Sequence, residues 1–393
     1  MFIYCFLPIS LWIYSGSTWI NIAIDNNNIA FIQLIFILLP LIILIAEFET
    51  KSNQYISTLT VIFGLLLVDF TINSLLLFFL FYEFIIIALI ILLYIYIPSI
   101  YRIRTSFYFF IFNLMGSISF IFSLLLLVIG FSLFCLLLII PFLVKTPIFP
   151  FSYWLPEVHS EANTSISLLL AGLLLKISLF GLIRFILSSF YCSIRFISSL
   201  LLFIVIVGLI NISFSYFRYY DLKKIIALSS IIHLNLSLIG LLMLSSISLI
   251  SGLLLTISHS FSSFGLFLVI GCIINKTNIR LIDSLCYCGF NIKLMLFFLM
   301  LANISFPLSI NFIAELFMII ALVNIDIPLL VIVLLILVVN CLFWFLVINV
   351  KISYCNCYYS LSYNWMMVVG LILLYIYGFG TFYLIEFYCY YFV

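Results

Sequence analysis

Uninterrupted apolar stretches, most of them about as long as a bilayer is thick, follow one another along the whole chain. Of 393 residues, 68% are hydrophobic and only 7% are charged, whereas a soluble domain carries about 25% charged residues. There are too few polar side chains to cover a water-exposed surface, and a disordered chain would be hydrophilic and highly charged. The sequence therefore predicts a protein that crosses a membrane many times.

Polar segments divide the chain into about thirteen predicted transmembrane helices, because a spanning helix needs about 20 apolar residues. Their approximate bounds are 2–20, 29–47, 55–71, 74–97, 106–129, 131–157, 164–186, 198–216, 222–243, 248–274, 290–322, 328–349 and 365–388. Runs such as Leu124–Leu127 do not alternate between apolar and polar residues, which argues against a membrane β-barrel. We expect an all-α polytopic membrane protein.

Prolines predict that two of these helices are interrupted. Pro141, Pro147, Pro150 and Pro156 lie in or at the end of the sixth predicted span, and Pro307 lies in the middle of the eleventh. Proline removes a backbone donor and clashes with the preceding turn, and backbone freed inside a bilayer is tolerated only beside protein or water. Two interrupted helices in corresponding positions are typical of inverted repeats around a transport path. The alternative is that both are tolerated kinks.

Six ionisable side chains lie well inside the predicted spans, where each charge costs roughly 2.5–3.5 kcal/mol at the bilayer centre. They are Glu83, Lys145, Lys176, His233, His259 and Glu315. Burial disfavours the charged form of such groups, and a neighbouring opposite charge favours it. A set of acids, bases and imidazoles on separate helices can therefore change its proton occupancy when one nearby charge changes. We expect these side chains to form one hydrated relay for protons or cations.

Each of these residues also has a purely structural interpretation. Glu83 and Lys145 can form an ion pair that only holds helices together, and Lys176 can extend to the membrane interface. The two histidines and Glu315 can be hydrogen-bonded core residues. The remaining acidic and imidazole side chains near span ends are predicted to be interfacial, namely Asp69, Glu157, His159 and Glu161.

The sequence contains none of the common motifs that hold nucleotides or iron–sulfur clusters. There is no G-x-x-x-x-G-K-[ST] and no G-x-G-x-x-G, and the ten cysteines are scattered through apolar runs, with Cys286/Cys288 and Cys355/Cys357 as the closest pairs. We expect no cofactor and no metal site, so the energy for any pumping would come from partner subunits. A net charge of +2 argues against a nucleic-acid partner.

Several segments resemble the antiporter-like membrane subunits of respiratory complex I. Residues 144–162, V-K-T-P-I-F-P-F-S-Y-W-L-P-E-V-H-S-E-A, are similar to the family signature K-x-P-x-x-x-x-H-x-W-L-P-x-A-H-x-E-A-P. Residues 170–184 resemble L-A-G-x-L-L-K followed by G-x-x-R, residues 221–233 resemble D-L-K-x-L-I-A-Y-S-S-x-x-H, and residues 257–263 resemble I-A-H-G-x-x-S. The resemblance covers roughly residues 25–390.

The second interrupted helix resembles that of one particular member among three paralogous subunits. Two of these paralogues carry a lysine there, and the third carries a glutamate. Residues 307–315, P-L-S-I-N-F-I-A-E, are similar to the glutamate version P-x-x-x-N-F-x-G-E, and residues 81–83 match its F-Y-E. The chain is therefore identified as a member of the glutamate-bearing group.

The chain departs from the family pattern at several positions. Ser152 stands where the family has a histidine, Asn163 where it has a proline and Ala314 where it has a glycine. A serine hydroxyl would need an additional water to relay a proton. Only 24 residues precede Asp25, where the family accommodates two helices, so we expect one N-terminal helix to be missing.

The resemblance implies a proton-translocating subunit of NADH:ubiquinone oxidoreductase in the mitochondrial inner membrane, with no redox centre in this chain. Its implied partners are the sibling antiporter-like chains 2 and 5, other membrane-arm and accessory subunits and phospholipids, and it binds no soluble ligand. The implied roles are a half-channel pair (Glu83 and Lys145), a central relay lysine (Lys176), a hydrophilic axis (His233 and His259) and an exit-side acid (Glu315).

The resemblance also implies an internal organisation. Two inverted five-helix repeats, at residues 55–197 and 198–349, would each contain one broken helix. They would lie between N-terminal transmembrane helices in residues 1–54 and a C-terminal transmembrane helix in residues 350–393.

Basic residues outside the helix interiors predict an orientation. With thirteen spans, one side of the membrane carries Lys51, Arg102, Arg104, Arg218, Lys223, Lys224, Lys276, Arg280, Lys293 and Lys351, and the other carries Arg184 and Arg195. Because the basic side of a membrane protein faces the cytoplasm-equivalent compartment, we expect the N-terminus in the matrix and the C-terminus in the intermembrane space.

Two other functions are compatible with the same residues. A sodium/proton antiporter subunit of the same ancestry would use a similar set of buried charges. A structural membrane-arm subunit that no longer pumps is the second alternative, and the serine at position 152 is the feature that favours it.

Overall fold

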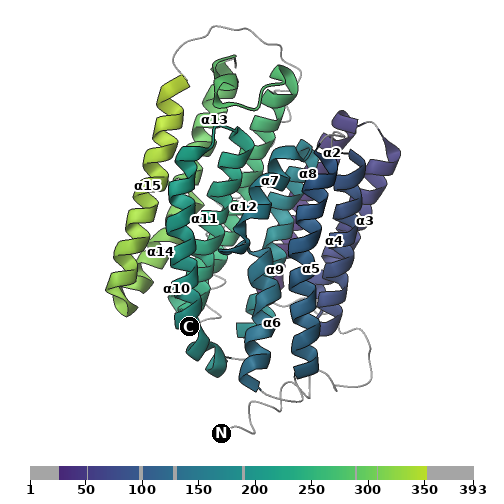
Figure 1. The fold of residues 1–393 in the computed structure, drawn as a ribbon. Coiled ribbons are helices and arrows are strands. Elements are labelled where there is room, and N and C mark those ends of the chain that lie inside the picture. The colour runs from purple at the N-terminus through teal and green to yellow at the C-terminus, as the bar shows by residue number, and fades with distance from the viewer. Residues whose placement is uncertain are drawn as a thin grey trace. The chain divides into compact units, whose positions relative to one another are not determined.

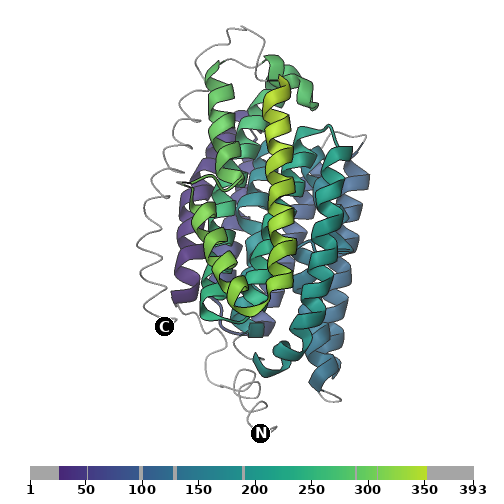
Figure 2. The same cartoon turned by 90° about the vertical axis from the view of Figure 1, so that its left-hand side faces the viewer.

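The structure is a computed structural model that describes residues 26–50, 52–96, 101–126, 131–187, 191–287, 290–307 and 309–351. These residues are almost entirely helical, as the ribbons in Figures 1 and 2 show. The all-α prediction is confirmed for this part of the chain. The first and last predicted spans, 2–20 and 365–388, lie outside the described residues.

The helices belong to two compact units. Unit 1 comprises the described residues within Met1–Pro147 and Leu173–Ser199, and unit 2 those within Ile148–Gly172 and Leu200–Val393. The elements of unit 1 are α2 (Asn26–Thr50), α3 (Asn53–Thr71), α4 (Leu75–Tyr96), α5 (Arg102–Leu126), α6 (Phe131–Lys145), α9 (Leu175–Gly181) and η3 (Leu182–Leu187). The elements of unit 2 are η1 (Phe151–Tyr153), α7 (Trp154–Glu161), α8 (Thr164–Leu169), η4 (Tyr216–Arg218), α11 (Leu222–Leu242), α12 (Ser246–Thr277), η5 (Ile282–Tyr287), α13 (Phe290–Asn303), α14 (Ile310–Ile325) and α15 (Ile327–Lys351). Residues of η2 (Leu170–Leu174) and α10 (Tyr191–Ser215) fall in both units.

Eleven of the predicted spans fall within the described residues, and all of them are found. Nine are helices long and apolar enough to cross a membrane. The other two are the spans that the prolines predicted to be interrupted, and each is divided between shorter helices, α6 with α7 and α13 with α14. The interruptions therefore follow from the sequence, whereas the proposed pair of inverted repeats stays a prediction.

The first interruption occupies residues 146–150, between α6 and η1. Thr146 bonds the end of α6 twice, since its backbone N–H (2.9 Å) and its hydroxyl (3.0 Å) both donate to the Phe142 carbonyl. On the far side, the Phe151 N–H donates to the Ile148 carbonyl at 2.6 Å. Carbonyl groups at the end of a helix have no partner within it, and these local bonds supply some of the missing partners.

The second interruption lies between α13 and α14, around Pro307. The Asn311 side chain reaches back across it and donates to the Ala302 carbonyl at 2.9 Å. The Ser309 hydroxyl caps α14 by accepting from the Phe312 N–H at 3.3 Å. Side chains therefore bond the backbone groups that the broken helix leaves free, as a chain inside a bilayer requires.

Unit 1 is held together by an aromatic core. Phe31 of α2 and Phe70 of α3 stack with ring centroids 5.5 Å apart, and both contact Phe180 of α9 at 5.3 and 5.0 Å. A Cβ on Gly181 would come within 2.3 Å of the Phe142 ring, so only a glycine allows this close approach of α9 to α6. Figure 1 shows α2, α3 and α4 near one another, and α3 packs against both α2 and α4.

Unit 2 is built around α11 and α12, whose backbones approach closely. A Cβ on Gly252 would lie 2.8 Å from the Ser237 carbonyl oxygen, and a Cβ on Gly240 would lie 2.9 Å from that of Ser248. Nearly every described residue of α11 is buried, and most of α12 is as well. Small residues let helix backbones pack in this way inside membranes, where close van der Waals contact holds helices together.

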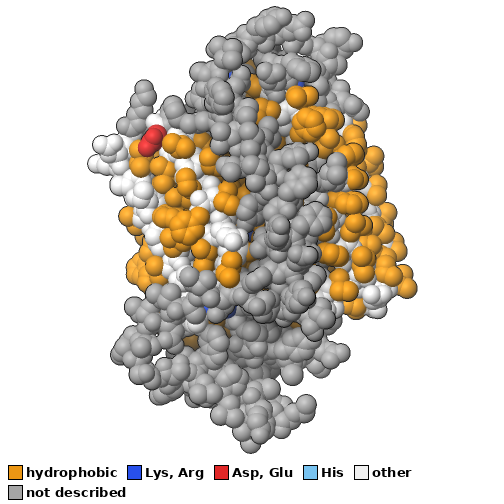
Figure 3. All heavy atoms as spheres, turned by 180° about the vertical axis from the view of Figure 1, so that it is seen from behind, with side chains coloured by type: hydrophobic (Ala, Val, Ile, Leu, Met, Phe, Trp, Pro, Cys, Tyr) orange, Lys and Arg blue, Asp and Glu red, His pale blue; other side chains and the backbone are white. Residues whose placement is uncertain are grey.

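The outward-facing side chains of the lateral helices are predominantly hydrophobic. Exposed large apolar residues recur along α4, α5, α10 and α15, for example Phe84, Phe107, Phe203 and Leu335. On the face drawn in Figure 3, the described side chains are mostly apolar, and acidic atoms are visible at one place near an end. Such a surface is suited to contact with lipid or with other membrane helices.

We expect Gly252→Ala to destabilise the protein by about 1–3 kcal/mol, because the added methyl would meet a backbone carbonyl that cannot rotate away. Gly64 on α3 is the matched control, since a Cβ there meets no atom within 4 Å. Gly64→Ala should be neutral or slightly stabilising. Thermal unfolding of the two variants in detergent, measured side by side, tests this, and equal stability of both would contradict the close α11–α12 contact.

Candidate functional site

A buried ion pair joins two helices of unit 1. Lys145 is the last residue of α6, and its Nζ lies 3.1 Å from Oε1 of Glu83 on α4. The lysine side chain is 4% exposed and that of the glutamate 25%, so the cation is enclosed while the acid lies closer to the surface of the unit. The position of Lys145 also suits a cation, because the C-terminal end of a helix carries partial negative charge.

Aromatic rings complete the surroundings of this ammonium group. The Nζ atom of Lys145 lies 3.2 Å from the ring centroid of Tyr82 and 5.6 Å from that of Phe79. Cation–π attraction of this kind contributes up to about 2 kcal/mol in a desolvated site. A buried charge is thus stabilised by one carboxylate and two ring faces, all of which come from α4.

Lys176 is fully buried in α9. It does not extend to the membrane interface, so that structural alternative is wrong. α9 lies between two π-helical turns, η2 before it and η3 after it. Turns of this type are rare and are found frequently at functional sites. Lys176 is therefore presented from an irregular part of its span, a feature that the sequence did not predict.

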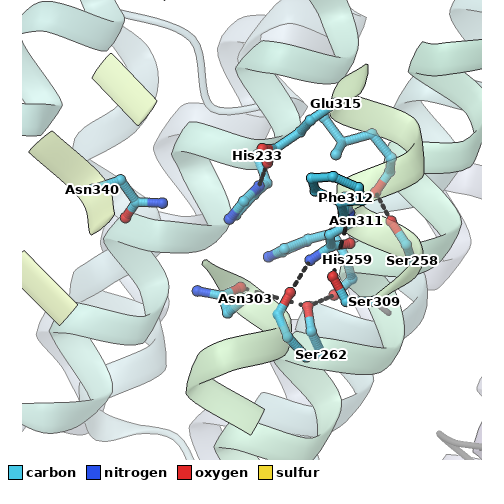
Figure 4. Close-up of polar contacts among 12 residues, drawn as sticks. His233, Ser258, His259, Ser262, Asn303, Ser309, Asn311, Phe312, Glu315 and Asn340 are labelled. Atoms are coloured by element: carbon cyan, nitrogen blue, oxygen red, sulfur yellow. Dashed lines mark hydrogen bonds and ion pairs between the residues drawn. The ribbon is translucent and has the colours of Figure 1, made fainter. Parts of the chain in front are cut away.

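Three titratable side chains meet in unit 2. Nδ1 of His233 on α11 lies 3.7 Å from Oε1 of Glu315 on α14, and the His233 ring stacks on that of His259 from α12 with centroids 5.1 Å apart. Figure 4 shows His233 pointing toward Glu315, with His259 beside them. All three side chains are buried. The distance of 3.7 Å between Nδ1 and Oε1 is longer than that of a hydrogen bond, so a small movement of either side chain is enough to form one.

Further polar side chains adjoin this cluster. The Ser262 hydroxyl on α12 lies 3.5 Å from Oδ1 of Asn303 at the end of α13, and Asn303 is fully buried. Figure 4 places both near His259, together with Asn311 at the second interruption. Broken helix, histidines and glutamate thus contribute to one polar region within unit 2.

Charged side chains at one end of unit 2 pair with one another. Lys224 of α11 bonds Glu157 of α7, and Arg280 bonds Glu161, each at 2.8 Å. Both acids were predicted to be interfacial, and both are partly exposed. His159 was predicted to be interfacial too; it is fully buried among protein atoms and stacks on Phe267 at 4.5 Å, and its depth in the membrane stays a prediction.

The start of α11 is held by a capping carboxylate. The Asp221 carboxylate accepts from the Lys223 N–H at 3.0 Å. Burial raises the pKa of this carboxyl group, and the hydrogen bonds from helix N–H groups oppose part of that rise. The Lys223 ammonium group donates to the Ala162 carbonyl at the end of α7, at 2.7 Å. Both residues belong to the D-L-K motif, whose acid and base thus fix the ends of two helices.

Asp69 and Ser152 are both buried inside the protein. Asp69, also predicted to be interfacial, is fully buried among protein atoms in the last turn of α3, and its depth in the membrane stays a prediction. Burial inside a protein cannot be predicted from the distance to a span end, which is why the burial of Asp69 and His159 was not predicted from the sequence. Ser152, which replaces the family histidine, is buried in η1.

The site residues predicted from sequence form a cluster in unit 2, whereas in unit 1 Glu83 and Lys145 form an ion pair and Lys176 lies on α9. Unit 1 holds Glu83, Lys145 and Lys176, and unit 2 holds His233, His259 and Glu315. Among the described residues, no group of three or more Cys, His, Asp or Glu side chains could hold a metal ion. These groups have the chemistry of proton carriers, while the single continuous file through both units stays a prediction.

Comparison of sequences identifies the relatives of this chain. Residues 125–340 match the family described as NADH:quinone oxidoreductase/Mrp antiporter, TM. Proteins named NADH-ubiquinone oxidoreductase chain 4 from Acanthamoeba castellanii and Chondrus crispus are 33% and 32% identical, over 80% and 78% of this chain and 68% and 67% of theirs. The protein of that name from Prototheca wickerhamii is 31% identical over 75% of this chain, which spans only 61% of its length.

Solved structures share the fold. A chain of respiratory complex I from Thermus thermophilus with bound NADH superimposes with a TM-score of 0.81 at 19% identity, covering 96% of this chain and 89% of that one. The Mrp complex from Dietzia contributes a chain with a TM-score of 0.75 at 17% identity, covering 91% of this chain and 74% of that one. These likenesses confirm the antiporter-like fold.

Replacing Glu83 and replacing Lys145 should both destabilise the protein, and the two losses of stability should differ in size. We expect Glu83→Gln to cost about 3 kcal/mol, because it leaves the enclosed Lys145 charge unpaired, and Lys145→Met to cost less, because Glu83 is partly exposed. The double variant should be more stable than Glu83→Gln alone. Thermal unfolding of all three variants tests this coupling, and strictly additive losses would show that the two groups act independently.

Proposed function

Because the chain belongs to the NADH:quinone oxidoreductase/Mrp antiporter transmembrane family, we propose that it is a proton-translocating membrane subunit of respiratory complex I. The observation that carries this proposal is the burial of opposed titratable groups inside a helical membrane protein, Lys145 with Glu83 and His233 with Glu315. Such pairs are costly in hydrocarbon and typically mark ion or proton pathways. The names of the relatives support complex I as the assembly.

In this proposal, the ion pair of unit 1 acts as a switch. While Lys145 bonds Glu83, both groups are held in their charged forms and the proton on the lysine is retained. Separation of the pair leaves an ammonium group buried without its counter-charge, which favours release of a proton inward. Lys176, fully buried on α9, is the next acceptor that we propose.

The cluster of unit 2 then carries the proton onward. A neutral imidazole accepts a proton at one nitrogen and donates from the other, so the stacked rings of His233 and His259 suit successive transfers. Glu315, 3.7 Å from His233, is the group that we propose passes the proton to the exit side. A hydroxyl such as that of Ser152 would need one bridging water more than the family histidine to relay a proton.

We propose that this chain carries no redox centre and that electrons pass through partner subunits. Its neighbours would be the sibling antiporter-like chains 2 and 5, other membrane-arm and accessory subunits and phospholipids. The names of the relatives support a mitochondrial inner-membrane protein, and the bias of basic residues supports an N-terminus in the matrix and a C-terminus in the intermembrane space. Residues 55–197 and 198–349 would be the two inverted repeats.

A second candidate function is sodium/proton exchange in a subunit of the same ancestry. It is favoured by the family description, which includes Mrp antiporters, and by the structural likeness to a chain of the Dietzia Mrp complex. The two functions differ in their ion, so a sodium requirement separates them. Proton uptake that proceeds equally in sodium-free buffer, and that is driven by NADH oxidation, supports the complex I subunit.

Proton pumping by the intact assembly in sealed membranes tests the proposal. We expect Lys176→Met and Glu315→Gln to lower NADH-driven pumping by about tenfold or more while the assembly still forms, because each variant removes a proton carrier. Asp326→Asn is the control, since Asp326 is exposed and its bond to the Leu329 N–H can be made equally by asparagine.

Normal pumping by both Lys176→Met and Glu315→Gln would overturn the proposal in favour of a structural subunit. Loss of assembly is read separately on native gels, so that a folding defect is not mistaken for a pumping defect. Sodium-dependent transport without any effect on NADH oxidation would instead support the antiporter function.

A further inference from the structure

Asp69 is a buried acid with no part in the mechanism described above. It lies in the last turn of α3, two residues before the helix ends at Thr71, and its exposure is 0%. Neither of its carboxylate oxygens has a hydrogen-bond partner among the described residues. This arrangement is unusual, because buried polar groups in folded proteins nearly always have a partner.

The position of Asp69 makes a permanent negative charge there costly. An enclosed carboxylate without a partner loses its hydration and receives nothing in return. The C-terminal end of α3 also carries the partial negative charge of a helix C-terminus, which repels an anion in the last turn. The site therefore favours either a proton on the carboxyl group or the arrival of a cation.

One cation of unit 1 interacts electrostatically with Asp69. Asp69 and Lys145 interact electrostatically, and Tyr82 interacts with both Asp69 and Glu83. Helices α3 and α4 are packed neighbours within unit 1, and α4 carries Glu83, which bonds Lys145 from α6. Lysine has a long, flexible stem, which lets its ammonium group change partners without a movement of the helix.

Arg184, another buried cation of unit 1, has different partners. Arg184 donates to the carbonyl of Phe70 at 3.2 Å and also bonds the side chain of Asn73. Asn28 donates to the same carbonyl at 3.1 Å. Arg184 and Asn28 thus bond the last turn of α3 and the segment after it, which directly follow Asp69 in the sequence. They position the corner in which Asp69 lies.

We propose that Asp69 is a second acceptor for Lys145, so that the ammonium group exchanges between an outer partner, Glu83, and an inner partner, Asp69. Glu83 is 25% exposed and Asp69 is fully enclosed, so the exchange moves a charge from the edge of unit 1 toward its interior. The ring of Tyr82, 3.2 Å from Nζ, offers a surface over which the ammonium group can move. This inference rests on the proposed proton-translocating function.

The transfer is balanced in protons. With Lys145 beside Asp69, one N–H bond of the ammonium breaks and one O–H bond of the carboxyl forms, which leaves a neutral amine and a neutral acid. The reverse step restores the charged pair. No oxidant, reductant or metal is involved. A neutral Lys145 can then take a new proton from water at the edge of the unit, since Glu83 is left as a carboxylate.

The test uses the intact assembly in sealed membranes and compares Asp69→Asn with Asp69→Glu. We expect Asp69→Asn to assemble but to lose about tenfold or more of its NADH-driven pumping, and Asp69→Glu to retain most of it, because only the carboxyl group is required. Glu47→Gln is the control, since Glu47 is an exposed acid of the same unit. Infrared difference spectra during turnover should contain a carboxyl signal that is absent in Asp69→Asn and shifted in Asp69→Glu.

The outcomes separate this inference from the proposed function. Lys145→Met is measured in parallel, and if it pumps normally the proposed function itself fails. If Lys145→Met abolishes pumping while Asp69→Asn pumps normally and its carboxyl spectrum is unchanged, only the role of Asp69 fails. If Asp69→Asn does not assemble, the spectrum of Asp69→Glu decides, and an unshifted carboxyl signal would overturn the proposal.

Discussion

Hydrocarbon offers no hydrogen bonds, and this constraint governs the rest of the structure. Every backbone polar group placed at membrane depth must find its partner within the protein. The chain meets this demand locally where its helices are interrupted, with Thr146 at the first interruption and Asn311 and Ser309 at the second. Only because the backbone is bonded there can the two broken helices lie inside the protein, close to the titratable side chains that they help to position.

Much of this architecture could be predicted from the sequence, because length and proline have simple physical consequences. A span must be about 20 apolar residues long, and a run of prolines cannot continue an α-helix. These two rules gave every described span and both interruptions. The pairing of Glu83 with Lys145 could also be anticipated, since two opposite charges in a chain with so few charges stabilise each other most effectively in contact.

What the sequence could not supply was the depth of a residue inside the protein. Asp69 and His159 lie near span ends, where a side chain can be hydrated, yet neighbouring helices enclose both of them. Hydropathy reports how a segment partitions between water and lipid, and it contains no information on which helices pack over a given residue. The same limit applies to η2 and η3, because no residue pattern in that apolar span distinguishes a π-helical turn from an α-helical one.

The π-helical turns beside Lys176 bear on how this span tolerates changes in length. A π turn accommodates one residue more than an α turn, so it can be regarded as an insertion that the helix has absorbed. Loss of one residue from Leu170–Leu174 would restore regular winding there and leave the following residues on the same face. A one-residue deletion at this place would thus be milder than one in α11, where it would turn every later side chain by about 100°.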